Sequence, residues 1–270
     1  MNRIIIAIIF SVTVATPVLA ASVDGIEIHS SSVGTGPAIV FIHGWTCDTS
    51  SWTEQVPAFE KEYCVITLDL PGHGQSNSPK DGNFSMDLFA RAVEAVRAEA
   101  GAEEIVLVGH SMGVMVIRQY ALTFPDRVAG LVAVDGPLDV RSFYASLQMD
   151  QPPAMTIEMR ENMIRGMFVP ETSIALQEKI MSTMLGTPEA TAKGAAAAMF
   201  DPSIRTADVI HAPTLAVVAG TTQVPDTESM KEIFPNFEAT QIAGTGHFLM
   251  MEKPDEFNRL LKTFLDSIEY

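Results

Sequence analysis

The sequence predicts an α/β protein in which a mostly parallel central sheet carries helices on both faces. Its 270 residues, 47% of them hydrophobic, are enough for one large core. Apolar segments alternate along the chain with segments of helical periodicity. Strands that are apolar at nearly every position are typical of parallel sheets, because such sheets are buried on both faces.

The strands can be read off in order. Residues 25–30 (GIEIHS) alternate between apolar and polar side chains, which predicts an exposed strand at the sheet edge. The later segments are mostly apolar, and we expect them to form the sheet interior; they are residues 38–44, 64–70, 104–109, 128–136, 213–220 and 237–244.

Helices are predicted between these strands from apolar residues spaced three or four apart. The first spans residues 86–100, with Ser85 as its N-cap and Gly101 as its stop. A second follows residue 111 and ends before Pro125. The closing helix, residues 253–268, is amphipathic, and one face carries Phe257, Leu260, Leu261, Phe264, Leu265 and Ile268.

Residues 136–212 interrupt this alternation, because they contain helical segments and prolines but no clear strand. We interpret them as a helical cap inserted into a core made of residues 21–135 and 213–270. Within the insertion, methionines recur every four residues, which places them along one helix stripe, at Met155, Met159, Met163 and Met167. The stripe either roofs an apolar acyl pocket or packs the cap onto the core.

The first twenty residues have the layout of a secretory signal peptide. Arg3 precedes an apolar run, and the small residues Val18 and Ala20 predict cleavage near Ala20/Ala21. The alternative is a membrane anchor, but the run is short for a span of about 20 residues. We therefore expect a periplasmic or secreted protein without stable membrane insertion after cleavage.

The charge of the chain argues against two classes of partner. The formal net charge of −16 argues against nucleic acid and against anionic membranes.

Cys47 follows one predicted strand and Cys64 begins the next, so in a parallel sheet they lie at opposite ends, too far apart for a disulfide. No metal-ligand spacing and no phosphate-binding loop is present, so neither a metal nor a cofactor is expected.

The pentapeptide GHSMG, residues 109–113, lies at the predicted turn from the strand 104–109 into the following helix. A sharp turn there needs small neighbours two residues away, and Gly109 and Gly113 meet that need. The turn lifts the Ser111 hydroxyl to the carboxyl edge of the sheet, where α/β proteins place their ligands. Ser111 is therefore the candidate nucleophile, and it requires a base.

With HGW at residues 43–45, DLPGHGQS at 69–76 and GTGHF at 244–248, the chain resembles the α/β-hydrolase fold family, in particular its esterase-like and lactonase-like serine hydrolases with a helical cap. The resemblance implies that Ser111 is the nucleophile and His247 the general base. It also implies that the backbone N–H groups of Trp45 and Met112 form the oxyanion hole, and that no cofactor is required.

The carboxylate of the triad departs from the family's common pattern. Relatives usually carry an acid about three residues beyond Gly220, but this chain has Gln223 there. Asp135, at the end of the strand 128–136, is the preferred substitute, since some lipase-like relatives carry their acid at that position. Asp226 is the alternative, although it also fits a helix N-cap. Glu228, or no acid at all, remains open.

These observations predict a secreted serine hydrolase that cleaves a carboxylic ester, a lactone or a similar acyl substrate, with a small apolar acyl or ester compound as its partner. Cofactor-free perhydrolysis and carbon–carbon hydrolysis on the same triad are alternatives. Another is a ligand-binding protein with little turnover, which Gln223 favours. Dehalogenase and epoxide-hydrolase chemistry is disfavoured, because those relatives carry aspartate where this chain has Ser111.

Overall fold

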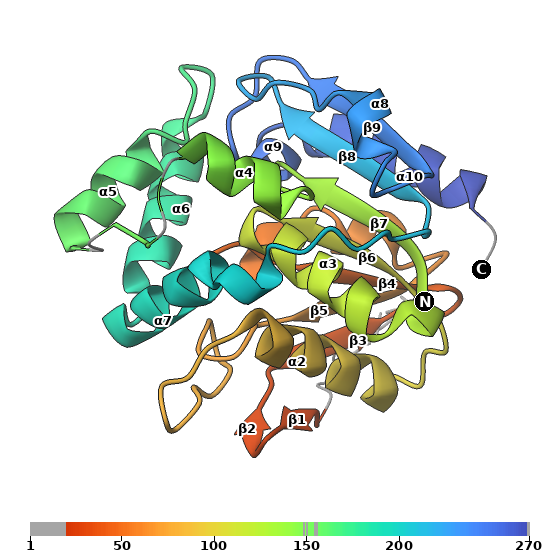
Figure 1. Cartoon of the computed structure of the whole chain (residues 1–270), viewed down its shortest axis with the longest axis horizontal. Coiled ribbons are helices and arrows are strands. Elements are labelled where there is room, and N and C mark those ends of the chain that lie inside the picture. Colours follow the sequence, from red (N-terminus) through yellow and green to blue (C-terminus); the bar gives the residue numbers. More distant parts are fainter. Residues whose placement is uncertain (1–19, 148, 150, 154–155, 269–270) are drawn as a thin grey trace, which may run out of the picture.

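The structure, a computed structural model, describes residues 20–147, 149, 151–153 and 156–268. Nearly all of the predicted signal peptide and Met155 lie outside the described residues. Within them, a seven-stranded sheet has the order β3-β5-β4-β6-β7-β8-β9, and β3 alone runs antiparallel to its neighbour (Figure 1). The predicted fold class is therefore confirmed. The sheet strands are β3 Ser30–Val33, β4 Ala38–Ile42, β5 Cys64–Leu68, β6 Ile105–His110, β7 Val128–Val134, β8 Thr214–Ala219 and β9 Phe237–Ile242.

The predicted edge strand at residues 25–30 is wrong in its placement. Asp24 and Gly25 both have positive φ, so the chain turns back and forms a small separate hairpin. This hairpin consists of β1 (Ser22–Val23) and β2 (Ile26–Glu27). The strand at this edge of the large sheet is the polar β3, whose Ser31 hydroxyl lies 2.9 Å from that of Thr67 on β5. The alternation of apolar and polar residues at positions 25–30 therefore indicated a strand of this hairpin and not an edge strand of the large sheet.

Helices cover both faces of the sheet. In Figure 1, α2 (Met86–Glu99) and α3 (Met112–Thr123) lie in front of the strands. Ser85 caps α2 as predicted, since its hydroxyl accepts a hydrogen bond from the Leu88 N–H at 3.0 Å. The remaining core helices and short helical turns are η1 Thr49–Trp52, α1 Val56–Phe59, η2 Pro125–Arg127, α8 Thr227–Met230, α9 Leu249–Glu252 and α10 Pro254–Ser267.

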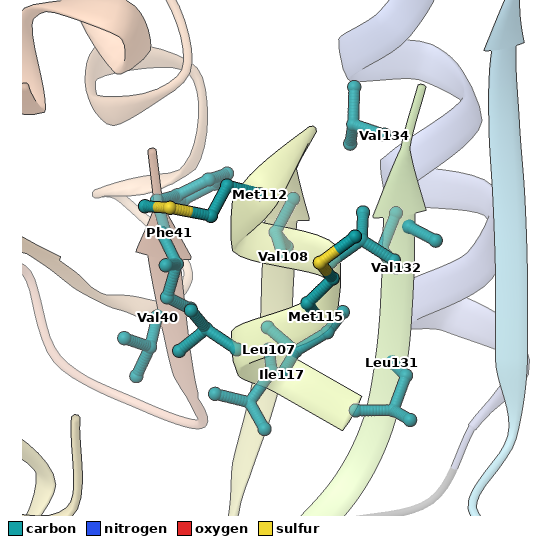
Figure 2. Close-up of a cluster of buried hydrophobic side chains, with 14 of the residues drawn as sticks. Val40, Phe41, Leu107, Val108, Met112, Met115, Ile117, Leu131, Val132 and Val134 are labelled. Carbon is teal, nitrogen blue, oxygen red and sulfur yellow. The ribbon is translucent and has the colours of Figure 1, made fainter. Parts of the chain in front are cut away.

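The central core lies between α3 and the middle strands. Figure 2 shows Met112, Met115 and Ile117 of α3 packed against apolar side chains of β4, β6 and β7. These side chains are buried almost completely. Truncating one of them to alanine typically costs about 2–5 kcal/mol of stability. The helix that begins directly after Ser111 is thus held firmly against the sheet.

The chain between β7 and β8 forms helices, and no strand occurs in the described residues of this stretch. These are α4 Val140–Leu147, α5 Ile157–Arg165, α6 Ile174–Gly186, α7 Glu189–Phe200 and the turn η3 Pro202–Ile204. In Figure 1, α5, α6 and α7 lie together beyond one end of the sheet.

The methionine stripe does not form one buried face. Met159 on α5 is 43% exposed, and Met167 lies beyond the C-terminus of that helix. The buried residues of α5 are Arg160 and Ile164. The methionine repeat is longer than α5, which spans only nine residues. The methionines therefore do not form one continuous stripe along the helix.

Cys47 and Cys64 are free thiols. Cys64 pairs in register with Ala38 at the start of β4, whereas Cys47 follows the end of that strand. Burial raises the pKa of the Cys47 thiol to about 12, so that side chain stays protonated. Among the described helices, none combines the length and the apolar character needed to cross a bilayer.

Candidate active site

The predicted nucleophile sits on a strained turn between β6 and α3. Ser111 has φ +54°, and its N–H donates to the Val134 carbonyl of β7 at 2.9 Å. A Cβ at Gly109 would lie 2.3 Å from the Gly113 carbonyl oxygen, and one at Gly113 would lie 2.6 Å from that of Ile42. Both positions therefore require glycine. The Ser111 side chain is half-buried, and its hydroxyl forms no hydrogen bond with the described residues.

The structure brings His247 and Asp135 together. Nδ1 of His247 lies 2.7 Å from Oδ2 of Asp135, a contact between residues 112 positions apart in the sequence. The carboxylate can only accept here, so the proton is on Nδ1 and Nε2 is left as the acceptor. The other carboxylate oxygen accepts the Ala219 N–H at 2.9 Å. Asp135 is thereby held by the last residue of β8 as well as by the histidine.

The Asp135 carboxylate is stabilised as an anion. Burial acts to raise its pKa, but the hydrogen bond and charge of His247, with hydrogen bonds from Ala219 and Thr222, outweigh burial and hold the pKa below its ordinary value. Asp135 is also one of the few described non-glycine residues with positive φ, at +41°. A constrained anion facing an imidazole is the arrangement that stabilises an imidazolium.

The other candidate acids lie elsewhere. Asp226 is the N-cap of α8, where its carboxylate accepts from the Ser229 N–H at 3.1 Å and from the Ser229 hydroxyl at 2.5 Å. Glu228 pairs with Lys231 at 3.0 Å. Gln223 is exposed in the loop after β8. The structure brings none of these three side chains to His247.

The predicted oxyanion donors are unpaired. The backbone N–H groups of Trp45 and Met112 donate to no other group in the part of the chain that the structure describes. Met112 is the first residue of α3, where backbone N–H groups have no partner within the helix. The Trp45 indole N–H is occupied, because it donates to the Ala192 carbonyl of α7 at 2.8 Å.

Other polar residues of the motifs hold turns. The ring of His43 donates from Nδ1 to the Gly44 carbonyl at 2.8 Å and accepts the Leu70 N–H at 2.9 Å. Asp69, predicted to be structural, accepts from the N–H groups of Thr49 and Gln75 at 2.8 and 2.9 Å. These bonds fix the HGW and PGHG segments beside the elbow.

Contacts on the backbone around His247 were not foreseen from the sequence. The His247 N–H donates to the Met167 carbonyl at 3.0 Å, and its own carbonyl accepts from Nε2 of His110 at 2.8 Å. The Gly246 N–H donates to Glu252 Oε2 at 2.7 Å. Burial raises the pKa of Glu252 against the hydrogen bonds that lower it. The motifs GHSMG and GTGHF contain His110, Gly246 and His247, but neither motif signals these contacts.

No group of three or more metal-ligating side chains occurs within the described ranges. The site instead assembles a serine on an elbow, a histidine–carboxylate pair and unpaired backbone donors. Loops after β4, β6, β7 and β9 supply them, so they gather at the carboxyl edge of the sheet. Such a set can perform nucleophilic acyl transfer.

Comparisons with known proteins agree with this architecture. The model of a family described as alpha/beta hydrolase fold matches residues 37–190. The chain is similar to the dihydrolipoyllysine-residue acetyltransferase component of the acetoin cleaving system of Cupriavidus necator, with 28% identity covering 91% of this chain and 68% of that protein. The solved structure of a thermophilic esterase from Thermogutta terrifontis superposes with a TM-score of 0.78 at 24% identity, covering 93% of this chain and 98% of that one. Est816, an N-acyl homoserine lactone degrading enzyme, superposes with a TM-score of 0.73 at 25% identity, covering 90% and 99% of the two chains.

Proposed function

The chain belongs to the alpha/beta hydrolase fold family, and we propose that within it the protein is a serine hydrolase that cleaves a carboxylic ester or a lactone through an acyl-enzyme. The observation that carries the proposal is the 2.7 Å contact between His247 and Asp135 at the sheet edge where Ser111 occupies the elbow. A base oriented by a buried carboxylate is what a serine nucleophile requires.

The proposed reaction has two halves. The Ser111 oxygen attacks the acyl carbon while Nε2 of His247 takes its proton, and the leaving alcohol then receives that proton. Water next attacks the acyl-enzyme with the same histidine as base, which releases the acid and restores Ser111. Asp135 stabilises the transient imidazolium, and the N–H groups of Trp45 and Met112 donate to the oxyanion.

The substrate class follows from the elbow and from one relative. Serine at the elbow supports an acyl-enzyme rather than the alkyl-enzyme chemistry of aspartate nucleophiles. Est816 degrades an N-acyl lactone, which supports lactones as one substrate class beside simple esters. The chain's net charge of −16 argues against polyanionic substrates.

We further propose that residues 136–212 cap this site. Two of their backbone carbonyls contact site residues, since Met167 accepts from the His247 N–H and Ala192 from the Trp45 indole. The Thr187 hydroxyl also donates to the Thr46 carbonyl at 2.9 Å.

Export of the protein is a separate proposal. N-terminal sequencing of protein recovered from outside the cytoplasm should give a sequence that begins at Ala21.

Replacement of the nucleophile tests the function directly. We expect Ser111→Ala to abolish hydrolysis of short p-nitrophenyl esters and acyl lactones, and to abolish labelling by a fluorophosphonate. Ser203→Ala, at an exposed serine, is the matched control and should behave as wild type. Labelling or turnover that survives in Ser111→Ala would contradict the proposal. A wild type that binds esters without cleaving them would favour a binding protein instead.

A further inference from the structure

The peptide group of His247 is held from both sides. Its N–H donates to the Met167 carbonyl at 3.0 Å, and its C=O accepts from Nε2 of His110 at 2.8 Å. The first contact comes from the segment after α5, and the second comes from the final residue of β6. Asp135 orients the ring of His247, whereas these two contacts fix its backbone.

His110 can act here only as a neutral donor. A carbonyl oxygen accepts hydrogen bonds but cannot donate, so Nε2 of His110 carries a proton. Its Nδ1 is buried and has no partner among the described residues, which would leave a second N–H unsatisfied. Burial, reinforced by repulsion from His247, lowers the pKa of His110 to about 3. The ring therefore keeps its proton on Nε2 at neutral pH and takes up no second proton during turnover.

His110 also contacts the proposed base and is the sequence neighbour of the proposed nucleophile. It immediately precedes Ser111, and its ring lies 4.7 Å from the His247 ring, centroid to centroid, and 5.2 Å from that of Phe248. A displacement of the His247 backbone would change the approach of Nε2 to the serine oxygen. A misplacement of about 1 Å can cost on the order of 100-fold in rate.

We propose that His110 is a positioning residue, whose Nε2–H sets the separation of Ser111 and His247 by holding the His247 carbonyl. This role rests on the proposed hydrolase function and adds a residue to it. The contact spans 137 positions of sequence and joins the strand of the nucleophile to the loop of the base.

Three substitutions separate the donor from the volume of the ring. His110→Gln places an amide N–H near the position of Nε2, so it can still reach the carbonyl. His110→Asn offers the same amide chemistry but reaches only to the position of Nδ1. His110→Phe keeps the aromatic packing against His247 and Phe248 and has no donor.

We expect kcat to fall by about 10- to 100-fold in His110→Asn and His110→Phe while KM changes by less than about threefold. His110→Gln should stay within about threefold of wild type. The rate of fluorophosphonate labelling of Ser111 should follow the same order. The midpoint of thermal unfolding, measured on each variant, shows whether folding accounts for a loss.

Two results would overturn this role while leaving the hydrolase intact. One is wild-type kcat in His110→Phe, and the other is an equal loss in His110→Gln and His110→Asn that follows their thermal midpoints. If the wild type neither hydrolyses acyl substrates nor reacts with the fluorophosphonate, the proposed function itself fails, and the role of His110 fails with it.

Discussion

At the residue scale, backbone strain is concentrated at residues of the candidate active site. The non-glycine residues with positive φ in the described ranges are Asp24, Thr46, Ser111 and Asp135. The last two are the proposed nucleophile and acid, and Thr46 follows a proposed oxyanion donor. Such conformations cost about 1–3 kcal/mol each and persist only where the surroundings fix them. The hydrogen bonds from the Ser111 N–H to the Val134 carbonyl and from the Asp135 N–H to the Val217 carbonyl supply that fixation.

The choice of acid leads to a prediction at this scale. Asp135→Asn should lower kcat by about 100- to 10,000-fold with little change in KM, because an amide does not stabilise the imidazolium. The matched control is Asp226→Asn, which removes a carboxylate that caps α8 but leaves His247 untouched. Steady-state kinetics on one ester would decide between them. A larger loss in the Asp226 variant would reverse the assignment.

At the element scale, the turns after β6 and β7 are packed against each other. A Cβ at Gly136 would lie 2.4 Å from the Ser111 carbonyl oxygen and 2.6 Å from Cγ2 of Val114. Val114, a branched residue in the first turn of α3, is therefore accommodated because its neighbour on the acid's turn has no side chain. The elbow and the acid-bearing turn form one packed unit.

This packing predicts that Gly136→Ala disturbs both the fold and the site. We expect a lower thermal midpoint and at least a tenfold fall in kcat, because backbone atoms of the elbow would have to shift. Gly186→Ala is the control, since nothing lies within 4 Å of a Cβ there and the residue ends α6. That variant should unfold at or slightly above the wild-type midpoint. Similar behaviour of the two variants would contradict the packing argument.

At the scale of the whole molecule, buried histidines link stability to pH. Burial is the main reason that the pKa values of His73 and His110 fall from 6.5 to about 3, and it also lowers the pKa of His43. The unfolded chain takes up protons at these sites near pH 6.5, but the folded chain does not. Stability from these groups is therefore present above pH 6.5 and is lost as pH falls toward 3.

Urea unfolding should show this loss as a free energy of unfolding that falls between pH 7 and pH 4, because the unfolded chain binds protons at His73 and His110 that the folded chain does not bind. Asp135, with its lowered pKa, acts in the same direction below pH 3.8, whereas Glu252, with its raised pKa, opposes it. His73→Asn keeps a donor toward the Pro71 carbonyl, which Nδ1 contacts at 3.1 Å, and should flatten the dependence. Ser111→Ala should keep the wild-type slope. A stability that rises on acidification would refute the argument.

The sequence by itself determined the parallel strands, the helices flanking them and the serine on its elbow. These features depend on local signals, namely apolar runs, helical periodicity and two glycines that steric contacts require at Gly109 and Gly113. The edge strand predicted at residues 25–30 was misplaced, because alternation does not say which strand is the partner.

Only the tertiary structure decided which carboxylate meets His247 and what holds that histidine in place. The sequence does not show which of Asp135 and Asp226 meets His247. Asp135 does so because it follows β7, which lies between β6 and β8 in the sheet. The contacts of His247 with Asp135 and with His110 join residues more than a hundred positions apart. Contacts of that range depend on how strands and loops pack, which local patterns do not encode.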